Sequence, residues 1–482
     1  MSNNYLIIFG GISLEGQINK YELDPLATPD SGSHVRRKKD DIKEQIENEE
    51  EIAVRTPFQR DKDRILYSKA FRRLIHKTQV CFTGEMNEDI RTRLTHTLEV
   101  SQIARSIARQ VYANEYLAEA IAHGHDVGHT PFGHTGEEVL NNFLSGTDEG
   151  IKNKLKHTCE FSTKETELHF KHNFQSVRVL NELEEGYKDF KGLNLTYPVL
   201  EGILKHTSLK FKRGKLQGKS VVYENICGIE ELHIEQSFSC SLEGQIVALA
   251  DEIAQVCHDI EDAIEGNYES KEIICTQLQK LIEENDIYNL EKGTCINELI
   301  TQRQVKYLIS CIIGRVISDA VTEIKKNMKA LKCRELEAKY PLKVEIATEE
   351  CVLKNNQLFQ SLKKIENNYV INNYKIHRMN GKSSFVLRQI IKAYLTNPKQ
   401  LPDSVLEKYT DVCSIPCLKE KINEIGSTPK NVRYLNESDF SRYKDCIIAD
   451  KGFLRLISDY IASMTDLYAI NEYQKLYGGE SI

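Results

Sequence analysis

The chain has 482 residues, of which 40% are hydrophobic and 28% charged, and its formal net charge is -7. This composition is typical of a soluble globular protein with a sizeable core, and the negative charge argues against general binding to nucleic acid. No apolar run approaches the roughly 20 residues that cross a bilayer, and the amino terminus lacks the basic and long apolar stretches of a secretory signal. We therefore expect a cytoplasmic protein without a membrane span.

The thirteen cysteines form no CxxC pair. An odd number of cysteines in so long a chain favours reduced, mostly buried thiols over a disulfide framework. The length allows one large helical body with subdomains. We divide it into an amino-terminal extension (1–54), a core (55–267), a helical region that continues the core (268–400), and a carboxy-terminal loop with a docking helix (401–482).

Helical patterns begin soon after the amino-terminal extension. Residues 35–54 are highly charged, which predicts a solvated helix or a flexible lead-in. Residues 60–74 carry an apolar helical stripe with basic residues opposite. The clearest stripe lies in residues 95–111, where the apolar positions are Leu98, Ile103, Ile107 and Val111. This spacing predicts a long helix with His96 in its first turn.

Two further helices carry polar residues of interest. Residues 115–129 (EYLAEAIAHGHDVGH) are typical of a helix that runs into a glycine-containing segment and is broken by Thr-Pro-Phe-Gly. His125 and Asp126 would then lie near a helix end, where consecutive side chains can turn toward one ion. Residues 240–266 form another helical pattern, and Asp251 falls among its apolar positions. A carboxylate there is costly unless it is paired or ligated.

The rest of the chain is also mainly helical by pattern. Residues 306–327 predict a helix, and residues 453–477 predict a last amphipathic helix that docks on the body. Proline, glycine and serine in 396–404 and 413–431 indicate loops or a hinge. Residues 210–238 show no helical period and suit a loop or a short hairpin. The expected fold class is all-α with at most a minor β-hairpin.

Two basic tracts stand out in this acidic chain. The first contains Lys205, Lys210, Lys212, Arg213, Lys215 and Lys219, and the second contains Lys325, Lys326, Lys329, Lys332 and Arg334. Most such runs are solvated faces. A local basic pocket can nevertheless bind an anion, so contact with phosphate stays open for both tracts.

A dense group of metal-ligating residue types lies in residues 120–137. The stretch contains His123, His125, Asp126, His129, His134 and Glu137, although the whole chain has only 14 histidines. A single histidine is more often a surface or satisfied core residue. The density of this stretch, with His96 before it and Asp251 after it, favours a metal centre instead. Imidazole nitrogen and carboxylate oxygen together suit Mn²⁺, Fe²⁺, Zn²⁺ or Mg²⁺.

Several ordered segments resemble one known family. They are RTRLTHTLEV (91–100), HDVGHTPFGHTGE (125–137), HNFQS (172–176) and EGQIVALADEIAQVCHDIEDAI (243–264), supported by KAFRRLIHKTQV (69–80) and SDYIASMTDLYA (458–469). Their combination resembles the deoxyguanosinetriphosphate triphosphohydrolases of the HD-domain superfamily. The likeness covers most of the chain from about residue 55 onward, and the ordered combination is specific where a bare His-Asp dipeptide would be weak.

The resemblance implies a metal centre and a reaction. His96, His125, Asp126 and Asp251 would bind a divalent ion, which agrees with the interpretation of the residues themselves. The family hydrolyses a deoxynucleoside triphosphate at the α-phosphorus and releases deoxynucleoside and intact triphosphate. A divalent ion polarises the phosphoryl oxygen, activates water and aligns the nucleophile, while the departing 5′-oxygen needs a proton. Mn²⁺, Mg²⁺ and Fe²⁺ all stay open as the ion.

The resemblance also implies roles for neighbouring polar residues. His134 resembles the histidine that acts on the leaving group, and Glu137 resembles the acid that orients this histidine or the water. His129 would contact phosphate or move a proton. For His129 and Glu137 the alternative is local hydrogen bonding that shapes the loop. Arg93 lies three residues before His96, on the same face of a helix that includes both, and is the expected phosphate ligand.

Polar residues outside the histidine-rich stretch are candidate substrate contacts. Gln79 matches a residue that reads the sugar or base, and its alternative is an ordinary solvent-facing side chain. Asn173 and Gln175 are further candidates, although Asn and Gln often only cap or cross-link helices.

Two departures from the family pattern put base selectivity in doubt. Gln255 stands where the family has a tyrosine in DDIAY, and His172 stands where many bacterial members have a small residue. We therefore do not expect strict preference for dGTP. Two other functions stay open, namely a hydrolase of another nucleotide phosphoester and a non-catalytic sensor of deoxynucleoside triphosphates or single-stranded DNA. A homo-oligomer, tetramer or hexamer, is expected from the resemblance.

Overall fold

The computed structural model describes residues 23–30, 55–79, 91–151, 168–188, 190–210, 229, 232–266, 270–285, 287, 302–332, 340–426 and 429–478. Within these ranges the regular structure is helical, and the β contact recorded is an isolated antiparallel bridge between Thr78 and Thr92. The all-α prediction is confirmed. The predicted lead-in at 35–54 lies outside the described residues, as does most of 210–238. No helix of the described part is long and apolar enough to cross a membrane.

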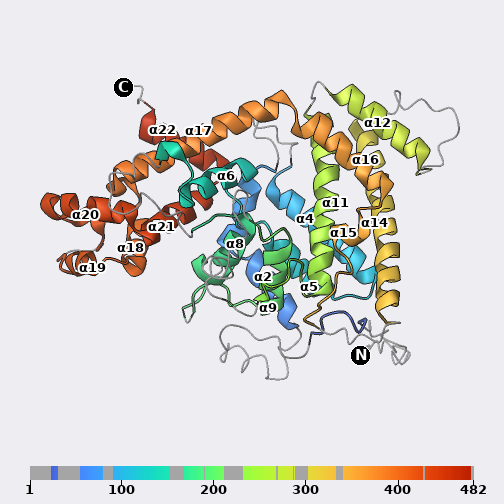
Figure 1. Ribbon diagram of the computed structural model, residues 1–482, viewed down its shortest axis with the longest axis horizontal. Helices are drawn as coiled ribbons and strands as arrows, with labels where there is room; N and C mark the ends of the chain where they lie inside the picture. Colours follow the sequence, from blue (N-terminus) through green and yellow to red (C-terminus); the bar gives the residue numbers. More distant parts are fainter. Residues whose placement is uncertain are drawn as a thin grey trace, which may run out of the picture.

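The elements follow one another in a helix-after-helix order (Figure 1). The first half contains α2 (Pro57–Leu66), α3 (Lys69–Arg73), η1 (Leu74–His76), α4 (Arg93–Gln110), α5 (Glu115–Gly124), α6 (Gly133–Leu144), α8 (His172–Arg178), η2 (Val179–Leu183), α9 (Tyr197–Lys205) and α11 (Leu242–Glu265). The second half contains α12 (Lys271–Glu284), α14 (Gln302–Lys332), α15 (Glu349–Val352), α16 (Gln357–Ile365), η4 (Glu366–Ile371), α17 (Tyr374–Thr396), η5 (Pro398–Gln400), α18 (Asp403–Val412), α19 (Pro416–Asn423), η6 (Val432–Tyr434), α20 (Glu437–Ala449), α21 (Lys451–Ala462) and α22 (Asp466–Tyr477).

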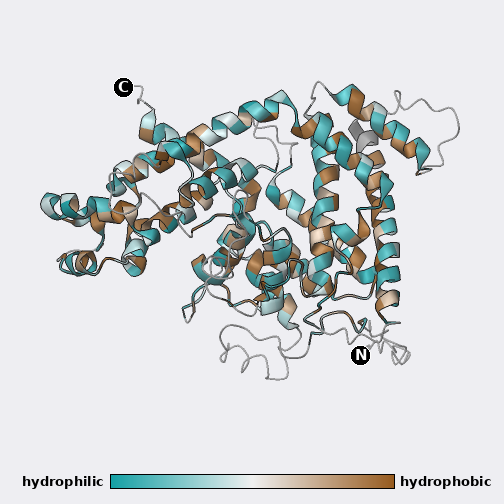
Figure 2. Cartoon of the chain, in the orientation of Figure 1, coloured by the Kyte–Doolittle hydropathy of each residue, from teal (hydrophilic) through white to brown (hydrophobic). Residues whose placement is uncertain are grey.

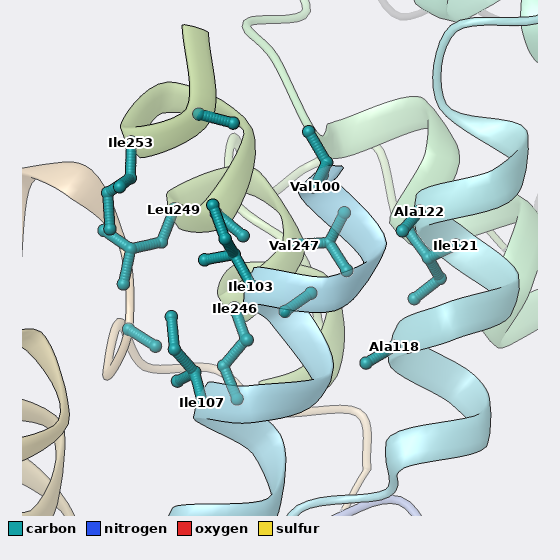
Figure 3. Close-up of a cluster of buried hydrophobic side chains, with 14 of the residues drawn as sticks. Val100, Ile103, Ile107, Ala118, Ile121, Ala122, Ile246, Val247, Leu249 and Ile253 are labelled. Carbon is teal, nitrogen blue, oxygen red and sulfur yellow. The ribbon is translucent and has the colours of Figure 1, made fainter. Parts of the chain in front are cut away.

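The centre of the fold is the packing of α4 against α5 and α11. Figure 3 shows buried side chains of this packing, among them Val100 and Ile107 of α4, Ile246 of α11 and Ile121 of α5, and these four are fully buried. Burial of this kind contributes about 1.5–3 kcal/mol per large aliphatic side chain. Three helices that carry candidate ligands are therefore fixed relative to one another by a shared apolar core.

One residue of the predicted α4 stripe was assigned to the wrong face. Leu98 is 48% exposed, whereas Ile103 and Ile107 are buried. The reason is geometric, since five residues from Leu98 to Ile103 turn the helix by about 500°, which leaves the two side chains about 140° apart. Thr92 caps this helix through its side chain, which accepts from the Thr95 amide, and His96 lies in the first turn as predicted.

A second hydrophobic cluster joins α6 to the carboxy-terminal helices. It contains residues of α6, α17, α18, α20, α21 and α22, while the first cluster extends from residue 26 to residue 376. Figure 1 shows α17 running along the top of the molecule from the α16 side to α22, and Figure 2 shows the mixed hydrophobic and hydrophilic faces of these helices. α6 directly follows the loop at 125–132, which contains His125, Asp126 and His129. The second cluster therefore fixes the carboxy-terminal end of this loop. The division of the chain at residues 54, 267 and 400 stays a prediction.

Three predicted element boundaries differ in the structure. The 60–74 stripe is split at Ser68, whose side chain caps α3 by accepting from the Phe71 amide. The predicted last helix is likewise split, because Thr465 caps α22. Residues 416–423 form α19 although the segment was assigned to a loop. Pro416 stands in the first turn of α19, where no backbone N–H is needed, so the proline starts a helix there.

Candidate metal centre

Two imidazoles and two carboxylates from three helices converge on one point. His96 comes from α4, His125 is the C-cap of α5 and precedes Asp126, and Asp251 comes from α11. Nε2 of His96 lies 2.9 Å from Oδ1 of Asp251. Nε2 of His125 lies 3.5 Å from Oδ1 of Asp126 and 3.6 Å from Oδ1 of Asp251. The structure thus brings the four predicted ligands together.

The orientation of His125 fits a metal ligand. Its Nδ1 donates to the Ala122 carbonyl at 2.6 Å, which leaves the lone pair on Nε2. Among the described residues, this buried Nε2 has no hydrogen-bond partner. Backbone anchoring of one ring nitrogen is how metal-ligating histidines are usually fixed. His96 is supported differently, because its Nδ1 lies 3.3 Å from Nδ1 of the buried His258. The residues present therefore fit a divalent ion.

The ionisable groups of the site shift one another's pKa values. Burial raises the pKa of Asp126, but His125, His129 and Arg93 outweigh it and hold this pKa well below its usual range. The pKa of Asp251 is also held low, since His125 and His96 outweigh its burial. Burial lowers the pKa of His125, and the two carboxylates outweigh it and raise this pKa to about 9. A metal ion must displace the proton on the His125 ring, so the affinity for the ion should decrease as the pH is lowered below about 9.

The predicted phosphate ligand Arg93 and the predicted catalytic residue His129 both contact Asp126. Arg93 is 2% exposed, and its Nη1 donates to Oδ2 of Asp126 at 2.7 Å. His129 places its Nε2 3.1 Å from Oδ1 of the same carboxylate. His134 is exposed, and its ring centroid lies 5.5 Å from that of His129. Arg93 is thus held against a candidate metal ligand, whereas the His134 side chain is exposed.

Glu137 lies close to two histidines and accepts hydrogen bonds from one of them, His172. Its Oε2 accepts from Nδ1 of His172 at 2.5 Å and from the His172 backbone amide at 2.9 Å. Burial raises the pKa of Glu137, but His172 and then His134 outweigh it and hold this pKa well below its usual range. The side chain is therefore an ionised acceptor that fixes His172, while His134 lies within 4.8 Å of the same group.

Several of these groups border a cavity of about 490 Å³. Its lining includes Arg93, Asp126, His129, His134 and Asp251. A smaller cavity of about 190 Å³ adjoins it and is lined partly by apolar side chains, namely Phe132, Ile371, Ile376 and Met379. Gln79, His134 and Gln255 line both cavities. Cavities of this size suit a small ligand with a charged part and a flatter, less polar part.

Comparison with known proteins places this geometry in a family. Residues 93–255 match the HD domain model, and residues 354–414 and 441–475 match the phosphohydrolase-associated domain model. The chain belongs to the deoxyguanosinetriphosphate triphosphohydrolase-like family of HD-domain phosphohydrolases.

Curated relatives support the assignment along most of the chain. A deoxyguanosinetriphosphate triphosphohydrolase-like protein of Geobacter sulfurreducens is 33% identical over 423 residues, which cover 88% of this chain and 89% of that protein. A protein of the same name from Nitrosomonas europaea is 31% identical over 456 residues, covering 94% of this chain and 98% of its own. The likeness therefore spans both hydrophobic clusters and is not confined to the metal centre.

Two candidate substrate residues lie away from the cavity lining. Asn173 donates through Nδ2 to the Leu204 carbonyl at 2.7 Å, and Gln175 donates through Nε2 to Oδ1 of Asp459 at 3.0 Å. These bonds tie α8 to α9 and to α21. Neither residue lines either cavity. Gln79, by contrast, lines both, and within the described ranges its buried Oε1 has no hydrogen-bond partner.

The basic tracts are only partly described. Lys205 is buried and forms an ion pair with Glu201 at 2.8 Å, so it is not a solvated member of a basic surface. Lys326 pairs with Glu323 on the solvent-facing side of α14, and Lys332 pairs with Asp24. Lys212, Arg213, Lys215, Lys219 and Arg334 lie outside the described residues.

Sequence reasoning missed two groups that the structure places at the site. His206, the C-cap of α9, donates through Nδ1 to the Ile203 carbonyl at 2.7 Å and lines the larger cavity. Burial and the neighbouring His125 and His172 lower its pKa to about 3. Lys77 donates to the backbone carbonyl of His129 and so supports the loop. His206 is a lone histidine beside a basic tract, so no local pattern marks it.

Proposed function

We propose that this protein hydrolyses deoxynucleoside triphosphates to deoxynucleoside and inorganic triphosphate in a reaction that requires a divalent ion. The observation that carries the proposal is the convergence of His96, His125, Asp126 and Asp251. The two carboxylates of this group line a cavity together with Arg93 and His134. Membership in the family supports the coarser class of HD phosphohydrolase. The names of the relatives support the choice of nucleotide.

The four converging residues would hold the ion. A divalent ion such as Mn²⁺, Mg²⁺ or Fe²⁺ polarises a phosphoryl oxygen and lowers the pKa of a nearby water. Arg93 orients Asp126 through their 2.7 Å contact and carries a positive charge at the cavity wall. Arginine suits phosphate because its donors are fixed in a plane. We therefore assign Arg93 to both tasks, positioning of a ligand and binding of the α-phosphate.

The reaction breaks the bond between the α-phosphorus and the 5′-oxygen. Water adds to phosphorus, and the 5′-oxygen leaves as an alcohol, so it must gain the proton that water loses. His134 is exposed at the cavity and close to His129, which in turn contacts Asp126. We assign the proton donor to His134. His129 then links His134 to the carboxylate that faces the ion.

The two cavities suggest how the nucleotide lies. Glu345, Glu349 and Glu350 line one rim of the larger cavity and would repel phosphate, so the triphosphate should lie toward Arg93. The smaller cavity is lined partly by apolar side chains, and the amides of Gln79 and Gln255 lie at its junction with the larger one. We assign it to the deoxyribose and base. Gln255 replaces the tyrosine of the family pattern at this junction, which supports relaxed base selectivity.

A product assay tests the proposal. The full-length protein is incubated with each of the four deoxynucleoside triphosphates and Mn²⁺ or Mg²⁺, and the products are separated by anion exchange. Deoxynucleoside and triphosphate in equal amounts are expected. Deoxynucleoside monophosphate with pyrophosphate would refute the reaction. His96→Phe should abolish turnover. His123→Phe is the matched control, because His123 is also a buried histidine but packs against Phe71 and is not one of the four converging residues.

The expected partners stay predictions. A tetramer or hexamer of this chain and contact with single-stranded DNA are tested by light scattering and by salt-dependent DNA binding. Binding of DNA without any nucleotide hydrolysis would favour the sensor over the enzyme.

A further inference from the structure

The start of the last helix, α22, contacts two segments of the site that lie far earlier in the chain. Asp466, the first residue of α22, is 2% exposed. Its Oδ1 accepts from the Phe132 backbone amide at 2.8 Å. Its Oδ2 accepts from the backbone amide and the hydroxyl of Thr78 at 2.8 and 2.7 Å. One buried carboxylate therefore joins residues that are 334 and 388 positions away from it.

Lys77 joins the same parts of the molecule a second time. Its Nζ donates to the carbonyl of Ala462, the last residue of α21, at 2.9 Å, and also to the His129 carbonyl. α6, which follows the loop at 125–132, packs against α21 (Figure 1). We call the hydrogen bonds made by Lys77 and Asp466 the clasp. The clasp ties the junction of α21 and α22 to both segments at once.

The first of these segments, 77–79, supports the proposed phosphate ligand. The Arg93 backbone amide donates to the Lys77 carbonyl at 2.9 Å, and Nη2 of Arg93 donates to the Gln79 carbonyl at 3.5 Å. Thr78 forms the isolated bridge to Thr92, the N-cap of α4. A displacement of Thr78 would therefore move Gln79 and the start of α4 together.

The second segment, 129–134, carries the proposed proton donor. Phe132 has a φ of 62°, in the left-handed region that side chains rarely adopt, and its own side chain does not cap α6. Gly133 is left-handed too, and a Cβ there would lie 2.9 Å from Nη2 of Arg93. The bond from the Phe132 amide to Asp466 holds this strained turn, and His134 follows two residues later.

The two segments form facing parts of one cavity lining. Thr78 and Gln79 of the first segment and Phe132 and His134 of the second all line the smaller cavity, which we assign to the deoxyribose and base. The Asp466 carboxylate joins these parts from behind. The spacing of the lining therefore depends on a residue that lines neither cavity.

We propose that Asp466 is a positioning residue for nucleotide hydrolysis. It acts through Thr78 and Phe132 on the residues that bind the nucleotide and protonate the leaving group. A displacement of about 1 Å in such groups can lower a rate about 100-fold. The inference rests on the proposed function, and it gives a task to the segment 458–469, which that function does not use. The carboxy-terminal helices thereby become part of the working site.

Asp466→Asn tests the proposal because one oxygen becomes an NH₂ group, which cannot accept a hydrogen bond. The amide of either Phe132 or Thr78 then loses its acceptor. We expect kcat for a deoxynucleoside triphosphate to fall about 10–100-fold and KM to rise. The affinity for Mn²⁺ should stay unchanged, since the helices that carry the four converging residues are held by their own apolar core.

Asp450→Asn is the matched control. Asp450 is also a buried carboxylate, 6% exposed, and it accepts from the Ser414 amide and from the Tyr409 hydroxyl, but it lines neither cavity. It should lower stability and leave kcat and KM per folded molecule unchanged, with the folded fraction taken from urea unfolding. A partly unfolded sample lowers kcat in proportion but does not raise KM. The same kinetic constants in both variants would overturn the proposal.

Two further measurements decide the question without turnover. Hydrogen exchange at the amides of Thr78 and Phe132 should be faster in Asp466→Asn than in Asp450→Asn, and the metal-stripped protein should bind the nucleotide more weakly. Thr78→Val removes only one of the three hydrogen bonds and should weaken nucleotide binding about 5-fold, which serves if Asp466→Asn does not fold. Unchanged exchange and affinity would refute the positioning role. If the unaltered protein binds the nucleotide but releases no triphosphate, the proposed function fails, and exchange and affinity alone then decide the role of Asp466.

Discussion

Replacement of Asp251 by asparagine isolates the charge of one proposed metal ligand. Oδ1 of Asp251 lies 2.9 Å from Nε2 of His96 and 3.6 Å from Nε2 of His125, and the amide keeps the size of the side chain. A unit charge about 4 Å from another contributes on the order of 4 kcal/mol at an effective dielectric constant of about 20. Desolvation offsets part of this. We expect a loss of on the order of 3 kcal/mol, which weakens Mn²⁺ binding about 100-fold.

The consequence for stability follows from linkage. At a free Mn²⁺ concentration of about 100 times the dissociation constant, the ion stabilises the unaltered protein by about 2.7 kcal/mol. At the same concentration, a variant with 100-fold weaker binding gains only about 0.4 kcal/mol. Calorimetric titration gives both constants, and urea unfolding with and without Mn²⁺ gives both stabilisations. Equal stabilisation of the two proteins by Mn²⁺ would refute the role of Asp251 as a ligand.

Three other predictions concern packing and pH. In Gly128→Ala the new Cβ would lie 2.1 Å from the Ser176 amide nitrogen. We therefore expect the free energy of unfolding in urea to decrease by at least about 2 kcal/mol. An unchanged urea midpoint would contradict the close approach of this loop to α8. Burial lowers the pKa of Lys77 to about 7, whereas the pKa in the unfolded chain is about 10.5. Between these two pH values the unfolded state binds more protons than the folded state, so the free energy of unfolding should rise with pH from about 7 to about 10. Lys77→Met should flatten that slope in unfolding curves measured across this window, and parallel slopes would count against it. Burial and then Glu366 raise the pKa of Asp259 well above its usual range, so the free energy of unfolding should fall as pH rises from about 4. Asp259→Asn removes this charge and should raise the urea midpoint at pH 8. A lower midpoint would show that the charge is needed for stability.

The four residues of the candidate metal centre could be singled out from the sequence because each stands out in its own segment. His96 begins an amphipathic helix, His125 and Asp126 end one, and Asp251 interrupts an apolar face. Each of these placements needs only helical periodicity and the cost of a buried charge. The convergence itself needed the family resemblance, since periodicity does not say which helices pack together.

What the sequence could not predict depends on contacts between distant segments. His206 joins the site because α9 packs against α5 and α8. Glu137 of α6 accepts from His172 at the start of α8, 35 residues later in the chain. Lys205 belonged to a basic tract by sequence, yet its partner Glu201 lies one turn away inside the core. The breaks at Ser68 and Thr465 escaped notice because capping by a single hydroxyl does not interrupt the apolar pattern.

Hydrolysis in water enriched in ¹⁸O tests the central claim most directly. If the ion held by His96, His125, Asp126 and Asp251 directs water to the α-phosphorus, the label should appear in the released triphosphate, at its end derived from the α-phosphate, and the deoxynucleoside should stay unlabelled. Phosphorus NMR resolves the labelled end group, and mass spectrometry reads the deoxynucleoside. Label in the deoxynucleoside, or in pyrophosphate released with a monophosphate, would contradict the account.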